Sequence, residues 1–90
     1  MKIGVVAGNV WSSRKDEGLV GVKLLIISLQ DREENNECSR RVAADLIGAG
    51  IGEKVLITEG SSARNMRGLE NSPVDAIVVG IIDEEKIGAL

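Results

Sequence analysis

Two short segments of this chain are apolar at nearly every position, and this pattern constrains the fold more than any other feature. Residues 22–30 (VKLLIISLQ) and residues 76–83 (AIVVGIID) are typical of strands, because Val, Ile and Leu dominate both. Successive side chains of a strand point to opposite faces. Leu24 and Ile26 therefore lie on one face of the first segment, and Leu25 lies on the other. A strand of this kind must be covered on both faces.

The length of the chain limits what that cover can be. The chain has 90 residues, which predicts a single domain over residues 1–90. A domain this small buries only about 60–65% of its unfolded surface, and no long helical periodicity is present to supply a layer of helices. Burying one Val, Leu or Ile contributes about 1.5–3 kcal/mol. We therefore predict an obligate oligomer; the alternative is that the chain's own short helix or tail covers the outer face of one strand.

The remaining segments predict an all-β fold. Residues 2–11 indicate a strand bent at Gly4 or Gly8, and residues 54–60 indicate a further short strand. Residues 40–49 (RRVAADLIGA) are compatible with a strand or with a helix. About five short strands separated by turn signals favour a small β-barrel or sandwich. A short helical turn is expected after the strand at 54–60.

Charge and aromatic content disfavour nucleic-acid binding. The net charge is −3, from 11 basic and 14 acidic residues with the two signs interspersed. Binding to nucleic acid depends on neutralising phosphates, and single strands are held on aromatic stacking platforms. Trp11 is the only aromatic residue of the chain. An OB-type module that binds single-stranded nucleic acid is therefore the alternative function, not the leading one.

The residues that usually carry catalysis are scarce. The chain has no His, and its one cysteine, Cys38, is expected in a polar loop as an incidental thiol. A lone cysteine also suggests a reducing compartment. Glu33, Glu34 and Glu37 are expected to be a solvated group, not a metal site. We expect no catalytic residue, no metal and no cofactor, and the N-terminal segment lacks the continuous apolar region of a signal peptide.

The glycine-rich stretch GAGIGEK, residues 48–54, raises the question of phosphate binding. A P-loop needs the spacing GxxxxGK[ST] between a strand and a helix. Gly48, Gly50 and Gly52 have a different spacing, Glu53 adds a negative charge, and a strand pattern follows. We therefore predict that these glycines form a tight turn with positive φ between two strands.

The sequence GSSAR, residues 60–64, is the better candidate for anion binding. Ser61 and Ser62 offer hydroxyl and N–H groups, and Arg64 offers a guanidinium. The alternative is a helical turn capped by Ser61 or Ser62, with Arg64 solvated or in an interface.

Three stretches together resemble one known family. They are MKIGVVAGNVWSSRKDEGLVGVKLLII, DLIGAGIGEKVLITEGSSAR and SPVDAIVVGIIDE, which cover most of the chain in order. They are similar to the EutN/CcmL family, the vertex proteins of bacterial microcompartments such as carboxysomes. The resemblance implies an OB-like five-stranded β-barrel that forms a homopentamer with a narrow axial pore. It also implies a structural role without enzyme activity, at the corners of a cytoplasmic shell tiled by hexameric shell proteins.

The resemblance also suggests which residues take part in assembly. Two loops are expected around the five-fold axis or at the edge that faces neighbouring tiles: Gly48, Ala49, Gly50, Gly52 and Glu53 in one, and Ser61, Ser62 and Arg64 in the other. Trp11, Arg14 and Lys15 are expected contacts between tiles. Trp11 is an interface anchor in this interpretation, but it could equally plug the barrel.

Overall fold

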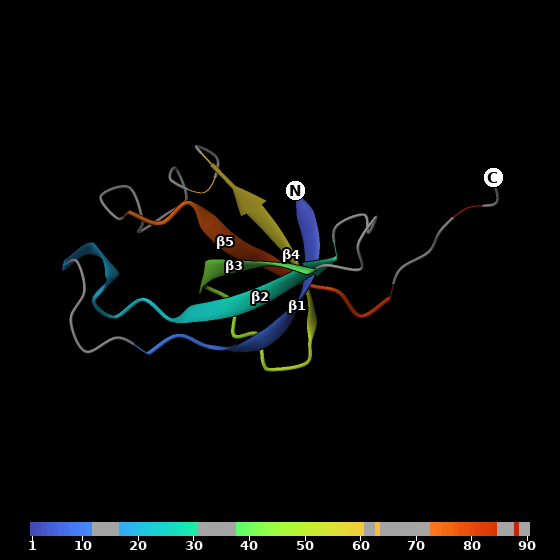
Figure 1. Ribbon diagram of the computed structural model, residues 1–90, viewed down its shortest axis with the longest axis horizontal. Helices are drawn as coiled ribbons and strands as arrows, with labels where there is room; N and C mark the ends of the chain where they lie inside the picture. The colour runs from blue at the N-terminus through green and yellow to red at the C-terminus, as the bar shows by residue number, and fades with distance from the viewer. Residues whose placement is uncertain (12–16, 31–37, 61–62, 64–72, 85–87, 89–90) are drawn as a thin grey trace.

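The computed structural model describes residues 1–11, 17–30, 38–60, 63, 73–84 and 88. Within these ranges the chain forms five strands and one short 3₁₀ helix (Figure 1). In order along the chain they are β1 (Lys2–Asn9), η1 (Glu17–Leu19), β2 (Leu24–Gln30), β3 (Cys38–Asp45), β4 (Lys54–Glu59) and β5 (Ala76–Ile81). The predicted all-β fold is confirmed, and the segment that was compatible with either a strand or a helix contributes most of β3.

The five strands close into a barrel in the order β1-β2-β3-β5-β4. Four of the five strand pairs are antiparallel, and only β3 and β5 run parallel. The strands β3 and β4 follow each other in sequence but are not neighbours, because β5 lies between them. The chain must therefore cross from β3 to β4 through the glycine-rich stretch, which is a crossover loop instead of a hairpin turn.

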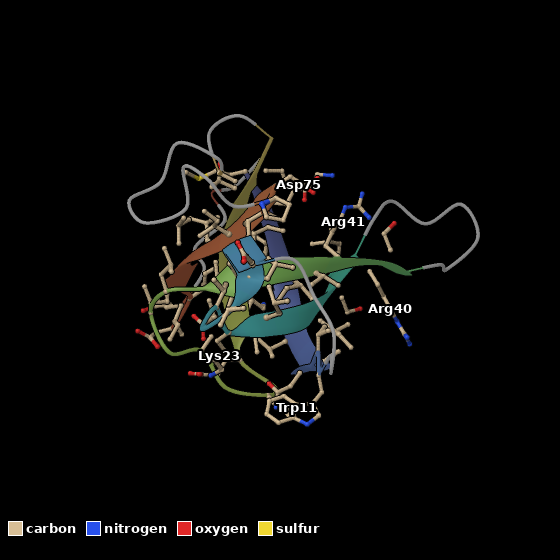
Figure 2. The ribbon with its side chains drawn as sticks, turned by 90° about the vertical axis from the view of Figure 1, so that its left-hand side faces the viewer. Trp11, Lys23, Arg40, Arg41 and Asp75 are labelled. Carbon is tan, nitrogen blue, oxygen red and sulfur yellow. The ribbon has the colours of Figure 1, made fainter. Side chains whose placement is uncertain are left out.

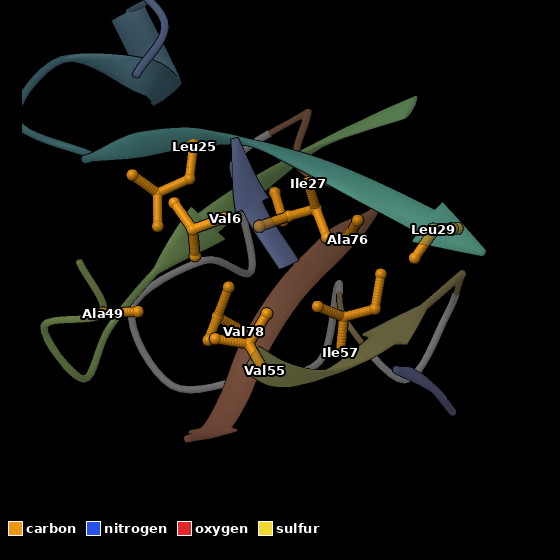
Figure 3. Packing of buried hydrophobic residues seen from close by; sticks show 10 residues of the cluster. Val6, Leu25, Ile27, Leu29, Ala49, Val55, Ile57, Ala76 and Val78 are labelled. Atoms are coloured by element: carbon orange, nitrogen blue, oxygen red, sulfur yellow. The ribbon is translucent and has the colours of Figure 1, made fainter. Parts of the chain in front are cut away.

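The barrel core is filled by the inward side chains of all five strands (Figure 3). Leu25, Ile27 and Leu29 point inward from β2 and are almost completely buried. This is one of the two faces predicted from the alternation in residues 22–30. The rest of the cluster consists of smaller or branched side chains: Val6, Ala43, Ala49, Val55, Ile57, Ala76 and Val78.

Two glycines of β1 have different roles in closing the barrel. A Cβ atom at Gly4 would collide with Ile27 Cγ2 and lie 2.9 Å from the backbone oxygen of Ser28. Glycine therefore allows β1 and β2 to approach closely at that point. The register of the same strand pair shifts between Val6 and Gly8. This shift lies beside Gly8, one of the two positions at which a bend was predicted, and an added Cβ at Gly8 would meet its nearest atom at 3.8 Å.

A second, smaller cluster covers the outer face of β5. Ile77 points away from the barrel core, yet it is fully buried together with Ala44, Ala63 and Val74. Leu19 of η1 packs against this cluster. The expectation that another subunit must cover both apolar strands was therefore wrong for β5, because the chain's own connecting segments cover Ile77.

Candidate assembly surfaces

Apolar side chains lie exposed on the outer face of three adjacent strands. Ile3 and Val5 of β1 are 45% and 38% exposed, and Val42 of β3 is 49% exposed. Between them, Leu24 and Ile26 of β2 are half-buried. We call these five residues the outer wall. The strand register places Ile26 opposite Val42, whereas Val5 lies opposite the polar Ser28. Exposed apolar side chains that gather on one side of a small barrel mark a candidate interaction site.

The crossover loop between β3 and β4 is organised around one buried carboxylate. Asp45 Oδ1 accepts hydrogen bonds of 3.0 Å from the backbone N–H groups of Ile47 and Gly48. Its Oδ2 accepts a third, of 2.9 Å, from the N–H of Ala49. A phosphate-binding loop offers such amides to its ligand, but here an acidic side chain of the same chain occupies them. In this structure these three amides are therefore not free to bind a phosphate.

Lys23 ties this loop to the start of β2. Its Nζ lies 3.4 Å from Asp45 Oδ2 and donates a 3.3 Å hydrogen bond to the carbonyl oxygen of Ala49. The Asp45 side chain is fully buried, while that of Lys23 is half exposed. The ammonium group therefore offsets a carboxylate that would otherwise be costly to bury. Sequence reasoning missed Asp45; the available signal was an Asp directly before a glycine-rich loop, where it commonly binds local backbone amides.

The second half of the loop is held by Glu53 and by β1. Glu53 Oε1 accepts a 2.6 Å hydrogen bond from Gly50 N, and Gly52 N donates a 2.8 Å hydrogen bond to the carbonyl oxygen of Val6. The φ angles of Gly48 and Gly52 are 87° and 89°. The positive-φ geometry predicted for these glycines is thus confirmed at two of the three positions.

This arrangement leaves apolar side chains of the loop in solvent. Leu46, Ile47 and Ile51 are 48%, 46% and 67% exposed. Ala49, in contrast, is buried in the barrel core, so its side chain is not available to a partner. We call Leu46, Ile47 and Ile51 the loop patch.

An ion-pair cluster lies where β4 ends. Glu59 Oε1 is 3.3 Å from Lys2 Nζ, and Glu59 Oε2 is 3.1 Å from Arg41 Nε. Partial desolvation raises the pKa of the Glu59 carboxyl, but hydrogen bonds and charge attraction from Lys2 and Arg41 outweigh this effect. The net result is a pKa below its ordinary value. The next residue, Gly60, has a φ of 74°, and its N–H donates a 2.8 Å hydrogen bond to the carbonyl oxygen of Asp75.

Several residues that the sequence singled out do not lie where they were expected. Trp11 is 93% exposed, so the interpretation as a barrel plug was wrong. Cys38 is the first residue of β3, opposite Gln30, instead of lying in a polar loop. Eight other candidate residues fall outside the described part of the chain: Arg14, Lys15, Glu33, Glu34, Glu37, Ser61, Ser62 and Arg64.

Among the described residues, no three acidic, cysteine or histidine side chains are placed to hold a metal ion together. In the same ranges, no helix has the length and apolar character needed to cross a membrane.

Comparison with known proteins gives consistent matches over most of the chain. The model of the family described as ethanolamine utilisation protein EutN/carboxysome matches residues 1–83. The carboxysome shell vertex protein CcmL of Gloeobacter violaceus is 49% identical over 83 residues, which are 92% of this chain and 83% of that protein. The bacterial microcompartment shell vertex protein EutN of Salmonella typhimurium is 44% identical over 88 residues, which are 98% and 89% of the two chains.

Solved structures agree with these matches. The structure of Gloeobacter violaceus CcmL superposes with a TM-score of 0.85 at 47% identity, over 97% of this chain and 90% of that one. The GrpN pentameric microcompartment shell protein from Rhodospirillum rubrum gives a TM-score of 0.82 at 40% identity, over 98% and 100% of the two chains. The resemblance found in the sequence is therefore confirmed.

Proposed function

This chain belongs to the EutN/CcmL family, and from that premise we propose that it forms a homopentamer that closes the five-fold vertices of a bacterial microcompartment shell. Relatives of this chain are named shell vertex proteins, and a solved structure of similar fold is described as pentameric. The protein acts as a structural part of a shell in the bacterial cytoplasm. These matches favour the shell function over the nucleic-acid-binding alternative.

The observation that carries the proposal is the outer wall. Ile3, Val5 and Val42 are between 38% and 49% exposed on one side of a small barrel, and water is an unfavourable environment for such a surface. A ring of identical subunits buries it when one face of each subunit meets a different face of the next. When five subunits close the ring, they form a pentamer with five-fold symmetry. An icosahedral shell needs a unit of that symmetry at each vertex.

The role is structural, with hexameric shell proteins as neighbours and no catalysis. We assign the contacts with those neighbours to the loop patch and to the loop that follows Gly60, with Arg14 and Lys15 as further contacts. Leu46, Ile47 and Ile51 support this assignment because they are apolar, exposed and held by a rigid hydrogen-bonded loop. A loop fixed in this way loses little conformational entropy when it binds.

Co-expression with a hexameric shell protein tests this function. We expect closed polyhedral shells by electron microscopy when both proteins are present, and open sheets or tubes when this chain is omitted. An Ile51→Glu variant serves as the matched control for the loop patch. This variant is expected to remain pentameric. It should enter shells poorly, because the new charge would lie in the contact between the pentamer and a neighbouring shell protein. Shells that close equally well without this chain would rule out the vertex function.

A further inference from the structure

Trp11 is the most exposed large apolar side chain of the described residues. It follows the end of β1 and is 93% exposed. The chain is fixed next to it, since the N–H of Val10 donates a 3.0 Å hydrogen bond to the carbonyl oxygen of Leu24. A tryptophan side chain has a large apolar area and one N–H donor. Side chains of this type dominate the binding energy of interfaces when they enter a well-packed pocket.

The structure contains a groove whose lining complements such a side chain. It has a volume of about 190 Å³ and is lined by apolar residues and one carboxylate: Leu19, Leu24, Val42, Ala44, Pro73, Val74 and Asp75. A cavity of about 150 Å³ holds a benzene ring, so this groove has room for an aromatic group larger than benzene. Leu24 and Val42 belong also to the outer wall, and the groove therefore continues that surface.

Asp75 gives the groove a polar feature that matches an indole. The residue is exposed and lines the groove. Within the described ranges its carboxylate forms no ion pair. A carboxylate at the rim of an apolar groove can accept a hydrogen bond from one N–H donor. Tryptophan has one such donor at the edge of its ring system.

Trp11 cannot fill the groove of its own chain in this conformation. Figure 2 views the barrel from the end that carries η1, and Trp11 and Asp75 lie on opposite sides of that end. The indole and the groove of one subunit therefore point to different neighbours. Two different, mutually complementary patches are what a head-to-tail ring requires.

We propose that Trp11 of one subunit occupies the groove of the next subunit around the ring, with its indole N–H directed to the Asp75 carboxylate. The proposal rests on the pentamer proposed above and identifies one contact that joins its subunits. It also changes the expected partner of Trp11 from a neighbouring tile to a second copy of the same chain.

Fluorescence of the single tryptophan tests the contact directly. In the assembled ring we expect a blue-shifted emission maximum and reduced quenching by acrylamide, relative to the monomer obtained by dilution. Oligomeric state is measured on the same samples by analytical ultracentrifugation. Trp11→Ala should weaken association by about 30-fold or more, as expected for an interface hot spot, with thermal unfolding of the monomer nearly unchanged because the side chain is exposed.

Variants of the groove test the other half of the contact. Val42→Glu places a charge in the groove at a half-exposed site, so we expect a folded chain with weakened association and red-shifted emission of Trp11. Asp75→Leu removes the acceptor and is expected to weaken association several-fold. Asp83→Leu is the matched control, since Asp83 is exposed but does not line the groove, and it should assemble like the unmodified chain.

The outcomes for Trp11 and its alanine variant separate this contact from the pentamer itself. A stable pentamer in which Trp11 stays quenchable and red-shifted, and in which Trp11→Ala associates normally, would overturn the contact and leave the proposed function intact. A normal Trp11→Ala pentamer that fails only to enter shells would assign Trp11 to a neighbouring tile. A chain that forms no ring at any concentration would overturn the proposed function and this contact together.

Discussion

Arg41 Nε lies 3.1 Å from Glu59 Oε2 and connects β3 to β4, two strands that are not neighbours in the barrel. Lys2 reaches the other oxygen of the same carboxylate from β1. One acidic side chain at the end of β4 therefore holds three strands together. Glu59 is the last residue of β4, so this cluster fixes the position at which that strand ends.

Replacing this carboxylate should change how stability depends on pH. The lowered pKa of Glu59 means that its pairs stabilise the fold above the ordinary value of 4.5, and that this contribution is lost as the pH falls through the folded pKa. Glu59→Gln should cost no more than about 2 kcal/mol at neutral pH, since partly exposed pairs contribute about 0.2–1 kcal/mol each. Urea unfolding across acidic pH measures this. If the free energy of unfolding fell as steeply below pH 4.5 in Glu59→Gln as in the unmodified chain, groups other than Glu59 would cause the acid destabilisation.

Removing the carboxylate of Asp45 should destabilise the crossover loop. Asp45→Ala leaves three backbone N–H groups without their acceptor, and an unsatisfied buried donor costs about 1–3 kcal/mol. We expect a loss of about 3 kcal/mol or more in the free energy of unfolding, with faster hydrogen exchange at residues 47–49. Lys23→Gln keeps those acceptors and is the control for exchange: it removes the cation beside a buried carboxylate and should also cost stability, but the amides of residues 47–49 should stay protected. Unchanged exchange at these amides in Asp45→Ala would contradict the assigned role.

Two alanine substitutions in β1 should differ sharply. Gly4→Ala forces a Cβ into Ile27 and the backbone of Ser28, so we expect a loss of about 1–3 kcal/mol. Gly8→Ala meets its nearest atom at 3.8 Å and should change stability by less than about 1 kcal/mol. The measurement is thermal unfolding of the two variants, under conditions in which both are monomeric. Equal losses would mean that the close approach of β1 to β2 does not limit the side chain at position 4.

A charge on the outer wall should block the ring, whereas the same charge on the loop patch should not. Ile3→Glu introduces an unpaired carboxylate into an apolar contact, which is costly to bury, and we expect association weakened at least tenfold. Ile51→Glu is the matched variant at a more exposed site, 67% against 45%, and should retain the pentamer. Size-exclusion chromatography with light scattering distinguishes them. If Ile51→Glu lost the ring and Ile3→Glu kept it, the loop patch would be the contact between subunits and the outer wall would not.

The barrel could be predicted from the sequence because its signals are local. The alternation in residues 22–30 placed Leu24 and Leu25 on opposite faces of one strand, and the positive φ of Gly48 followed from the turn chemistry of glycine. The cover of Ile77 could not be predicted in the same way. It depends on where η1 and Val74 pack in three dimensions, and the strand pattern contains no information about such non-local contacts.

The candidate surfaces were predicted less completely than the fold. The glycine stretch was recognised, but the residue that organises it, Asp45, was not, because its role depends on burial and on Lys23, which directly precedes β2. Trp11 was recognised as a possible anchor, but its exposure and the groove that complements it are properties of the folded chain. Such sites require the tertiary structure.

Native mass spectrometry of the unmodified chain at micromolar concentration tests the central claim most directly. The chain has a mass of 9.5 kDa, and we expect a dominant species of five times that mass. A spectrum that contains only monomer would contradict the account, because the outer wall would then stay exposed to water. A six-membered ring would keep the subunit contacts but contradict the assignment to five-fold vertices.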